Sequence, residues 1–179
     1  MSILPIFIPH AGCPHQCVFC NQKTISGQKL AAVAAAKEQL MRWRSWLQPS
    51  VGNEAAFYGG SFTGLPLELQ EELLALTDAM LAEGFIGSVR LSTRPDYIDE
   101  ERLQLLQRHG VRLVELGVQS LDDRVLAAAE RGHTAAQVAP AVALLKRFGF
   151  QVGLQLMVGM PEQSFASVQE TVRKAIEMH

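Results

Sequence analysis

Residues 88–118, SVRLSTRPDYIDEERLQLLQRHGVRLVELGV, decide the fold class of this chain. The stretch opens at 88–93 with a run that is typical of a strand. Asp99 then has a residue type that caps helix N-termini, and the leucine-rich segment after it ends at Gly110, a residue favoured at helix C-termini. A second strand-like run follows at 112–118. The order strand, helix, strand predicts two parallel strands joined by a crossover helix.

The same alternation extends in both directions from this stretch. Upstream we expect strands at 3–8 and 55–58 and helices at 29–47 and 66–83. Downstream we expect a helix from its cap Ser120 to 129, helices at 134–148 and 165–176, and a strand at 151–158. Repeated strand and helix units predict an α/β fold with a parallel sheet. We expect a partial (βα) barrel of about five to six units, since a complete eight-unit barrel takes about 250 residues.

The length and composition fit one large core. Of the 179 residues, 48% are hydrophobic, and no linker or composition shift divides the chain, so we expect a single core domain over 1–179. The last helix carries Val168, Val172 and Ile176 with no cap after them. We therefore expect an incomplete barrel of a longer protein, truncated at its C-terminus.

The charge is nearly balanced, with 16 Lys and Arg against 18 Asp and Glu and a formal net charge of −2. This balance does not indicate a nucleic-acid backbone as the main partner. No apolar run reaches the roughly 18–20 residues of a membrane span. Residues 1–10 lack the basic region and the cleavage site of a secretory signal. We therefore expect a cytoplasmic protein with no membrane partner.

The three cysteines of the chain, Cys13, Cys17 and Cys20, lie within eight positions in a C-x3-C-x2-C pattern. An odd number of cysteines in so short a loop does not build a disulfide framework. Thiolates at this spacing can bind three irons of one [4Fe-4S] cluster. The fourth iron then stays open to another ligand, and an open position is typical of a catalytic metal centre.

Two other interpretations of this loop stay open. The spacing also matches one face of a helix, in which case the cysteines are small buried hydrophobic residues. Alternatively, His10 or His15 completes a four-ligand zinc site with Cys13, Cys17 and Cys20, and the chain is a zinc-binding interaction module.

Further segments at the ends of the expected strands carry a resemblance to a known family. Phe19 stands directly before the third cysteine, and the segments GGSFT, LSTRPD and VELGVQS occupy 59–63, 91–96 and 114–120. Together with the cysteine pattern, they closely resemble the radical S-adenosylmethionine (radical SAM) superfamily. The segments GVQS, RGHT and GMP at 117–120, 131–134 and 159–161 resemble the branch of the Elongator catalytic subunit and the oxygen-independent coproporphyrinogen oxidases.

The resemblance to the Elongator subunit is weaker in the cysteine loop, which is longer there between its first two cysteines. We therefore do not expect acetyl-coenzyme-A-dependent tRNA chemistry. The family core usually has six strand and helix units, so the resemblance implies that one unit is missing from the five marked here.

The resemblance also implies which residues bind S-adenosylmethionine. It assigns Gly60, Ser61 and Thr63 to the methionine amino group and Arg131 to the carboxylate. The amide side chains of Gln119 and Gln155 are expected at the ribose. Relatives often have an acidic residue at position 155, and likewise at position 92. The complete expected site comprises the cluster ligands and catalytic residues Cys13, Cys17 and Cys20, with Phe19, Gly59, Gly60, Ser61, Thr63, Ser92, Arg94, Gln119, Arg131 and Gln155 at the cofactor.

From the residues alone, simpler roles stay open for three of these side chains. Gln119 also suits a surface turn, and Arg131 also suits a helix end in solvent. Arg94 also suits a local ion pair with Asp96.

Finally, the resemblance implies a reaction. An electron from a reduced flavodoxin or ferredoxin cleaves S-adenosylmethionine to methionine and a 5′-deoxyadenosyl radical, which abstracts hydrogen from a substrate. The sequence does not identify that substrate, and tRNA, porphyrin-like and protein substrates all stay open. A catalytically inactive fragment is the remaining alternative, because the expected barrel is incomplete.

Overall fold

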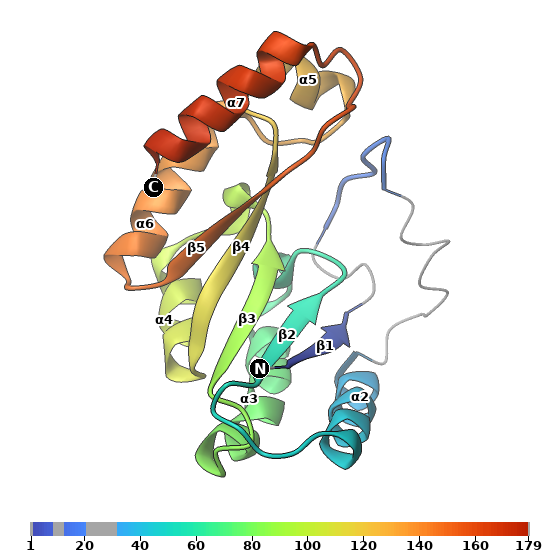
Figure 1. Ribbon diagram of the computed structural model, residues 1–179, viewed down its shortest axis with the longest axis vertical. Coiled ribbons are helices and arrows are strands. Elements are labelled where there is room, and N and C mark those ends of the chain that lie inside the picture. The colour runs from blue at the N-terminus through green and yellow to red at the C-terminus, as the bar shows by residue number, and fades with distance from the viewer. Residues whose placement is uncertain (1, 9–12, 21–31, 179) are drawn as a thin grey trace.

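A five-stranded parallel sheet forms the centre of the computed structural model, which describes residues 2–8, 13–20 and 32–178 (Figure 1). The strands are β1 (Ile3–Phe7), β2 (Glu54–Tyr58), β3 (Ser88–Thr93), β4 (Val111–Gln119) and β5 (Gln151–Leu156). They lie in chain order, and every neighbouring pair is parallel. Within the described residues the sheet is open, with β1 and β5 at its edges. The prediction of an α/β fold with a partial barrel is therefore confirmed.

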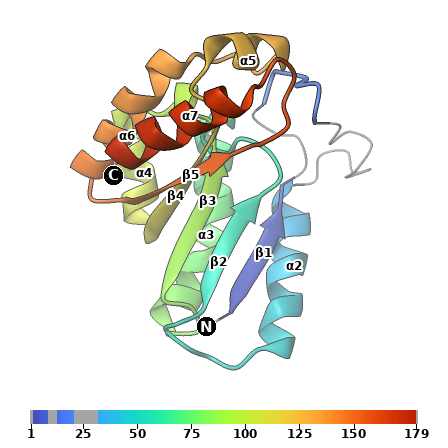
Figure 2. The same ribbon diagram turned by 45° about the horizontal axis from the view of Figure 1, so that its top comes forward.

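Helices connect the strands and cover one face of the sheet. They are α2 (Ala32–Trp46), α3 (Leu67–Ala82), α4 (Glu100–Arg108), α5 (Asp123–Ala128), α6 (Val138–Arg147) and α7 (Phe165–Glu177). Figures 1 and 2 show α2, α3 and α4 along one face, while no helix of the described residues lies over the opposite face of β1, β2 and β3. None of the helices between residues 32 and 178 has the length and hydropathy needed to cross a membrane.

Two helices start later than the sequence predicts, and the one expected from 134 begins at Val138 after a 3-10 turn over Ala135–Gln137. The helix expected from Ser120 begins at Asp123, because the Asp122 carboxylate caps it by accepting from the Arg124 N–H at 3.0 Å. The Ser120 hydroxyl instead lies 3.4 Å from the hydroxyl of Thr171 on α7. The same hydroxyl accepts from the Asp122 N–H at 3.1 Å, so Ser120 orders the turn before the helix and does not cap it. Residues 29–31 of the first expected helix lie outside the described residues.

The alternation of side chains along each strand separates an apolar face from a polar face. Leu91 on β3 and Leu116 on β4 are fully buried in the core cluster that the helices cover. Their neighbours Arg90 and Glu115 point to the opposite, open face. Because the functional residues follow the ends of these strands, a rigid central sheet sets their spacing.

Buried side chains on the central strands should therefore contribute strongly to the free energy of unfolding. Leu91→Ala should lower the free energy of unfolding by about 2–5 kcal/mol, the usual cost of deleting a fully buried leucine side chain. Val51→Ala is the matched control, because Val51 is 79% exposed and its truncation should change stability by less than about 0.5 kcal/mol. Urea denaturation followed by circular dichroism measures both values, and equal losses would contradict this assignment of the core.

Candidate functional site

The carboxyl ends of the central strands meet residues 13–20, here called the cysteine loop, around a cavity of about 230 Å³. Its lining residues are Cys13, His15, Cys17, Phe19, Cys20, Gly59, Gly60, Ser92, Thr93, Arg94, Gly117, Gln119, Arg131 and Gln155. All the residues expected at the site are in this set except Ser61 and Thr63. Parallel α/β folds bind their ligands at this end of the strands, so the cavity is the candidate site.

The three cysteines reach the cavity from a loop. Residues 13–20 contain a turn, in which the Cys20 N–H donates to the Cys17 carbonyl at 2.8 Å, and no helix. The interpretation of the cysteines as one face of a helix is therefore wrong. Cys17 is buried, whereas Cys13 and Cys20 are half-buried. Within residues 2–8, 13–20 and 32–178, no three Cys, His, Asp or Glu side chains are grouped to hold a metal ion, so metal binding requires these thiols to converge. His10 lies outside the described residues.

The cysteine loop is anchored on α5 and the segment after β5. The Val18 N–H donates to the Ala129 carbonyl at 3.2 Å. Phe19 packs against a small apolar cluster formed by Val125, Ala129 and Met160. The aromatic residue before the third cysteine therefore holds the loop against the rest of the fold.

Arg131 places a buried positive charge beside the Cys17 thiol. One terminal nitrogen of its guanidinium donates to the Gly117 carbonyl at 2.7 Å, and the other lies 3.7 Å from the Cys17 sulfur. A side chain at Gly117 would place its Cβ 2.8 Å from this guanidinium, so the contact requires glycine. With 8% exposure, Arg131 is not at a solvated helix end. Its Nε has no hydrogen-bond partner among the described residues, and a buried donor in this state favours a ligand acceptor.

Arg94 holds the backbone of Arg131 in place. Its guanidinium makes two hydrogen bonds with the Asp96 carboxylate, at 2.9 and 2.8 Å, and donates to the Arg131 carbonyl at 2.7 Å. Burial opposes the charge of Arg94, but the hydrogen bonds and charge of Asp96 outweigh burial and raise the pKa of Arg94. The local pair with Asp96 thus exists, and the same guanidinium also fixes the backbone that carries Arg131.

Ser61 and Thr63 do not line the cavity. Their hydroxyls lie 2.9 and 2.5 Å from the hydroxyl of Thr93, and the Ser61 hydroxyl also accepts from the Arg94 N–H at 3.3 Å. These contacts tie the end of β2 to the end of β3. The assignment of the Ser61 and Thr63 hydroxyls to the methionine amino group stays a prediction, and Gly59 and Gly60 are the residues of their segment that reach the cavity.

Neutral polar groups also line the cavity. Gln119 ends β4 at a register shift between Gly117 and Gln119, with a backbone φ of 67°. This bulge turns Gln119 toward the cavity and not into an exposed turn. Ser92 and Gln155 approach from β3 and β5, and the Gln155 Nε2 donates to the Ser92 hydroxyl at 3.2 Å.

The family model described as "Radical SAM superfamily" matches residues 7–175. The chain belongs to the radical SAM superfamily. The match covers the cysteine loop, all the strand ends around the cavity and most of α7.

Two relatives and one solved structure illustrate the family membership of this radical SAM chain. The chain is 26% identical to a tRNA uridine(34) acetyltransferase from Methanocaldococcus infernus, covering 92% of this chain and 38% of that protein. It is also 26% identical to an oxygen-independent coproporphyrinogen III oxidase from Synechocystis, covering 93% of this chain and 37% of that protein. The chain thus spans less than half the length of these relatives. Its fold is similar to that of coproporphyrinogen III oxidase (HemN) from Escherichia coli, with a TM-score of 0.73 at 21% identity over 99% of this chain and 42% of that chain.

Sequence reasoning missed three residues that shape the cavity or lie beside it. Thr93 ties two strand ends together, Gly117 makes room for Arg131, and Glu115 contacts both Ser92 and Gln155 at the open face. Side chains alternate along β4, so Glu115, Gly117 and Gln119 lie near one face of the sheet. This alternation was the signal in the sequence that could have identified Glu115 and Gly117. No local pattern marks Thr93, whose partners lie 30 and 32 positions away.

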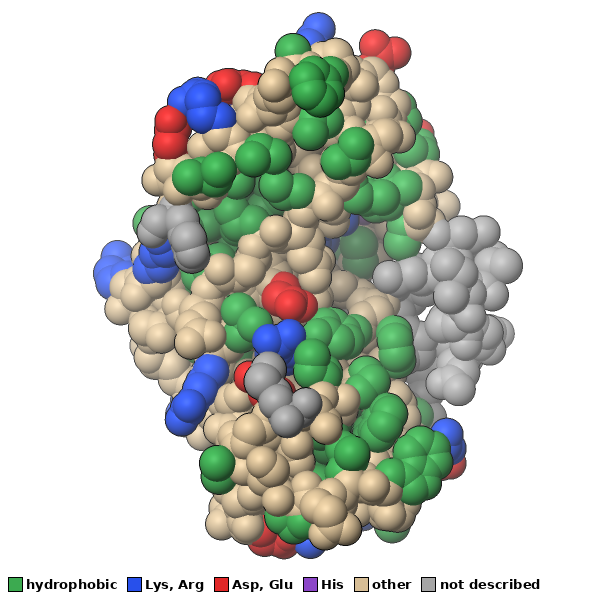
Figure 3. All heavy atoms as spheres, in the orientation of Figure 1, with side chains coloured by type: hydrophobic (Ala, Val, Ile, Leu, Met, Phe, Trp, Pro, Cys, Tyr) green, Lys and Arg blue, Asp and Glu red, His purple; other side chains and the backbone are tan. Residues whose placement is uncertain are grey.

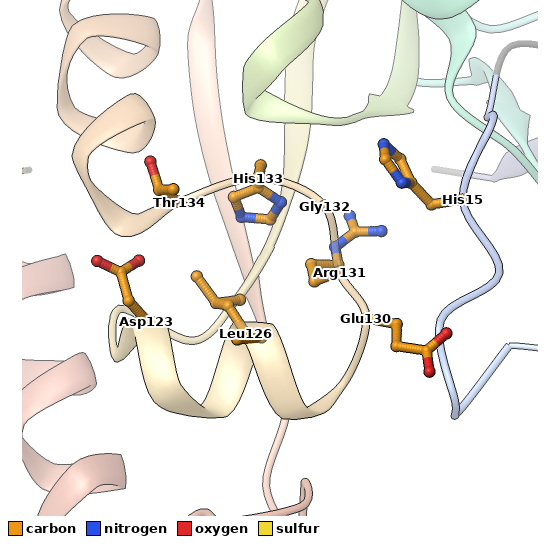
Figure 4. Close-up of a pocket in the computed structure, with 9 residues that line it drawn as sticks. His15, Asp123, Leu126, Glu130, Arg131, Gly132, His133 and Thr134 are labelled. Atoms are coloured by element: carbon orange, nitrogen blue, oxygen red, sulfur yellow. The ribbon is translucent and has the colours of Figure 1, made fainter.

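A second cavity, of about 620 Å³, lies between α5 and the segment 131–134 and shares His15 and Arg131 with the first (Figure 4). The His15 ring lies directly against Gly132, where an added Cβ would come within 2.2 to 2.6 Å of the ring atoms. Burial lowers the pKa of His15, and the charge of Arg94 lowers it further. The neutral His15 ring therefore packs between the cysteine loop and the segment that carries Arg131.

Gly132→Ala should displace the His15 ring and loosen the cysteine loop. Overpacking of this kind costs roughly 1–3 kcal/mol, so alkylation of Cys17 by iodoacetamide in the metal-free, reduced protein should become about tenfold faster. Mass spectrometry of the alkylated peptides measures the rate.

Gly149→Ala is the matched control for this change. Gly149 has a φ of 80°, close to the 79° of Gly132, but an added Cβ there meets nothing within 4 Å. It should introduce the same backbone strain and leave the alkylation rate of Cys17 unchanged. Equal acceleration in both variants would mean that the His15 contact does not hold the loop.

His133 should make stability depend on pH. Burial lowers its pKa to about 4, with contributions from the charges of Arg131 and Arg94. Between pH 6.5 and pH 4 the unfolded chain then binds one more proton at this position than the folded chain. The free energy of unfolding should fall by about 2–3 kcal/mol as the pH falls through this window, relative to a His133→Gln variant. Urea denaturation at several pH values measures both slopes, and parallel slopes would contradict the prediction.

Proposed function

We propose that this chain is the core of a radical SAM enzyme that holds a [4Fe-4S] cluster through Cys13, Cys17 and Cys20 and binds S-adenosylmethionine in the adjoining cavity. One observation carries the proposal: the three thiols line the same cavity as Arg131, whose buried Nε has no partner among the described residues. A metal centre and an anionic ligand therefore find complementary groups side by side.

The residues of this cavity fit the two cofactors chemically. Cys13, Cys17 and Cys20 supply three soft thiolate ligands, which leaves one iron of a four-iron cluster open. The charge of Arg94 is balanced by Asp96, so the charge of Arg131 is left for an incoming anion. A guanidinium is well shaped for a carboxylate, the one anionic group of S-adenosylmethionine.

When bound, the cluster supplies an electron and S-adenosylmethionine supplies the sulfonium bond that is cleaved to give methionine and a 5′-deoxyadenosyl radical for hydrogen abstraction from a substrate. The chain itself orients and encloses these groups. Arg131 holds the carboxylate, and the amides of Gln119 and Gln155 offer both donors and acceptors to hydroxyl groups. Phe19, packed against Val125, Ala129 and Met160 beside the buried Cys17, would limit the access of water to the cluster side of the cavity.

The partners of the proposed reaction follow from its chemistry. It needs a one-electron donor of low potential, for which we propose a reduced flavodoxin or ferredoxin. Three free thiols need a reducing compartment, which supports a cytoplasmic location. The names of the two relatives point to tRNA and to a porphyrin precursor as candidate substrate classes, and either is compatible with the polar strand ends described above.

Cys17→Ala should abolish cluster binding, because it removes the most buried of the three thiolates. Wild-type protein reconstituted anaerobically with iron and sulfide should contain about four irons per chain and should form 5′-deoxyadenosine from S-adenosylmethionine when dithionite is added. The variant should form no product above background. Val18→Ala is the control, since this neighbouring side chain is 55% exposed and does not line the cavity.

The metal content separates the proposal from its rival. A Cys17→Ala protein that still forms 5′-deoxyadenosine would exclude Cys17 as a cluster ligand. A colourless wild-type protein with one tightly bound zinc would instead support a zinc-binding module, in which His15 serves with the three thiolates.

A further inference from the structure

A row of charged and polar side chains crosses the open face of the sheet, from β2 to β5. It consists of Glu54, Arg90, Glu115, Ser92 and Gln155, and is called the polar row below. Arg90 lies between two carboxylates, at 3.0 Å from Glu54 and 3.6 Å from Glu115. Acidic and basic side chains lie together at the middle of this face in Figure 3. The three charged side chains are 16% to 19% exposed, whereas Gln155 at the β5 end of the row is an exposed residue.

The end of the polar row nearest the cavity is a closed set of three hydrogen bonds. The Ser92 hydroxyl donates to Glu115 Oε2 at 3.1 Å. The Gln155 Nε2 donates to the Ser92 hydroxyl at 3.2 Å and to the same Glu115 oxygen at 3.4 Å. Ser92 and Gln155 line the cavity, and Glu115 does not. Glu115 therefore reaches any bound ligand through these two neighbours.

The charge of Glu115 decides which way the Gln155 amide faces. An ionised carboxylate only accepts hydrogen bonds, so the amide nitrogen of Gln155 has to face it. The amide oxygen then faces the other way. Arg90 lies 3.6 Å from the other oxygen of Glu115, and this ion pair helps to hold the carboxylate in place.

We propose that Glu115 is a positioning residue, which fixes the Gln155 amide with its oxygen presented to the cavity as an acceptor for a ligand hydroxyl. This inference rests on the proposed function, in which the ligand hydroxyls are those of the ribose of S-adenosylmethionine. With the amide fixed before binding, the ligand meets an ordered acceptor and no side-chain freedom is lost on association. Ordering one such side chain should change the affinity roughly three- to tenfold, which corresponds to about 0.7–1.4 kcal/mol.

Glu115→Gln tests the proposal with little change of shape. The new amide can donate as well as accept, so the Gln155 amide is free to turn over. The dissociation constant of S-adenosylmethionine, measured by anaerobic titration calorimetry on the reconstituted protein, should rise about three- to tenfold. The dissociation constant of methionine, which has no ribose, should change less than about twofold.

Glu54→Gln is the matched control. Glu54 flanks Arg90 on its other side with the same 19% side-chain exposure, and it contacts neither Gln155 nor the cavity. Both variants lose one carboxylate partner of Arg90 and should lower the melting temperature by similar amounts. Only Glu115→Gln should weaken the binding of S-adenosylmethionine. Ser92→Ala removes the other acceptor for Gln155 Nε2 and should also weaken the binding of S-adenosylmethionine. It provides the test if Glu115→Gln does not fold.

A mutant cycle shows whether Glu115 acts through Gln155. In a Gln155→Ala background, adding Glu115→Gln should have no further effect on the affinity for S-adenosylmethionine. An undiminished effect in that background, an equal loss of methionine binding, or an equal loss in Glu54→Gln would each overturn the positioning role and leave the proposed function intact. A wild-type protein that takes up the cluster but does not bind S-adenosylmethionine would overturn the proposed function, and this inference with it.

Discussion

The arrangement of the candidate site depends on one buried ionic interaction, that of Arg94 with Asp96. A guanidinium that is 2% exposed would be strongly destabilising without partners, and two hydrogen bonds to Asp96 compensate it. The remaining donor of Arg94 binds the Arg131 carbonyl, so a charge at the end of β3 fixes the segment after α5. That segment in turn holds the cysteine loop through Cys17 and His15. Contacts within the fold thus position the loop.

The two faces of the sheet have different roles. The face under the helices is apolar and supplies most of the stability through residues such as Leu91 and Leu116. The open face carries the polar row, whose charges are mutually paired and whose last members enter the cavity wall. Ion pairs at the middle of the sheet therefore continue into hydrogen bonds at the cavity. Such a connected network holds the side chains at the site in fixed orientations, which a set of isolated polar residues does not.

Much of the fold could be predicted from the sequence, because strand and helix periods and the glycine and proline residues between them are local signals. The same signals placed the strand ends, and with them most of the cavity wall, including Gly60 and Gln119. Contacts between distant residues could not be predicted. Ser120 has the residue type of a helix cap but binds Thr171 of α7, and the cap is Asp122. The hydroxyls of Ser61 and Thr63 likewise meet Thr93, a contact that only the parallel pairing of β2 and β3 creates.

The cavity wall is built from single residues near the ends of separate strands, while the residues that hold the sheet together point to the other face of the same strands. This separation has a consequence for how such a protein diversifies. Ser92 and Leu91 are adjacent in the chain, yet a change at the first alters only the cavity and its polar neighbours, and a change at the second alters only the core. Substitutions that adapt the pocket to a new ligand can therefore accumulate one strand end at a time on an unchanged scaffold.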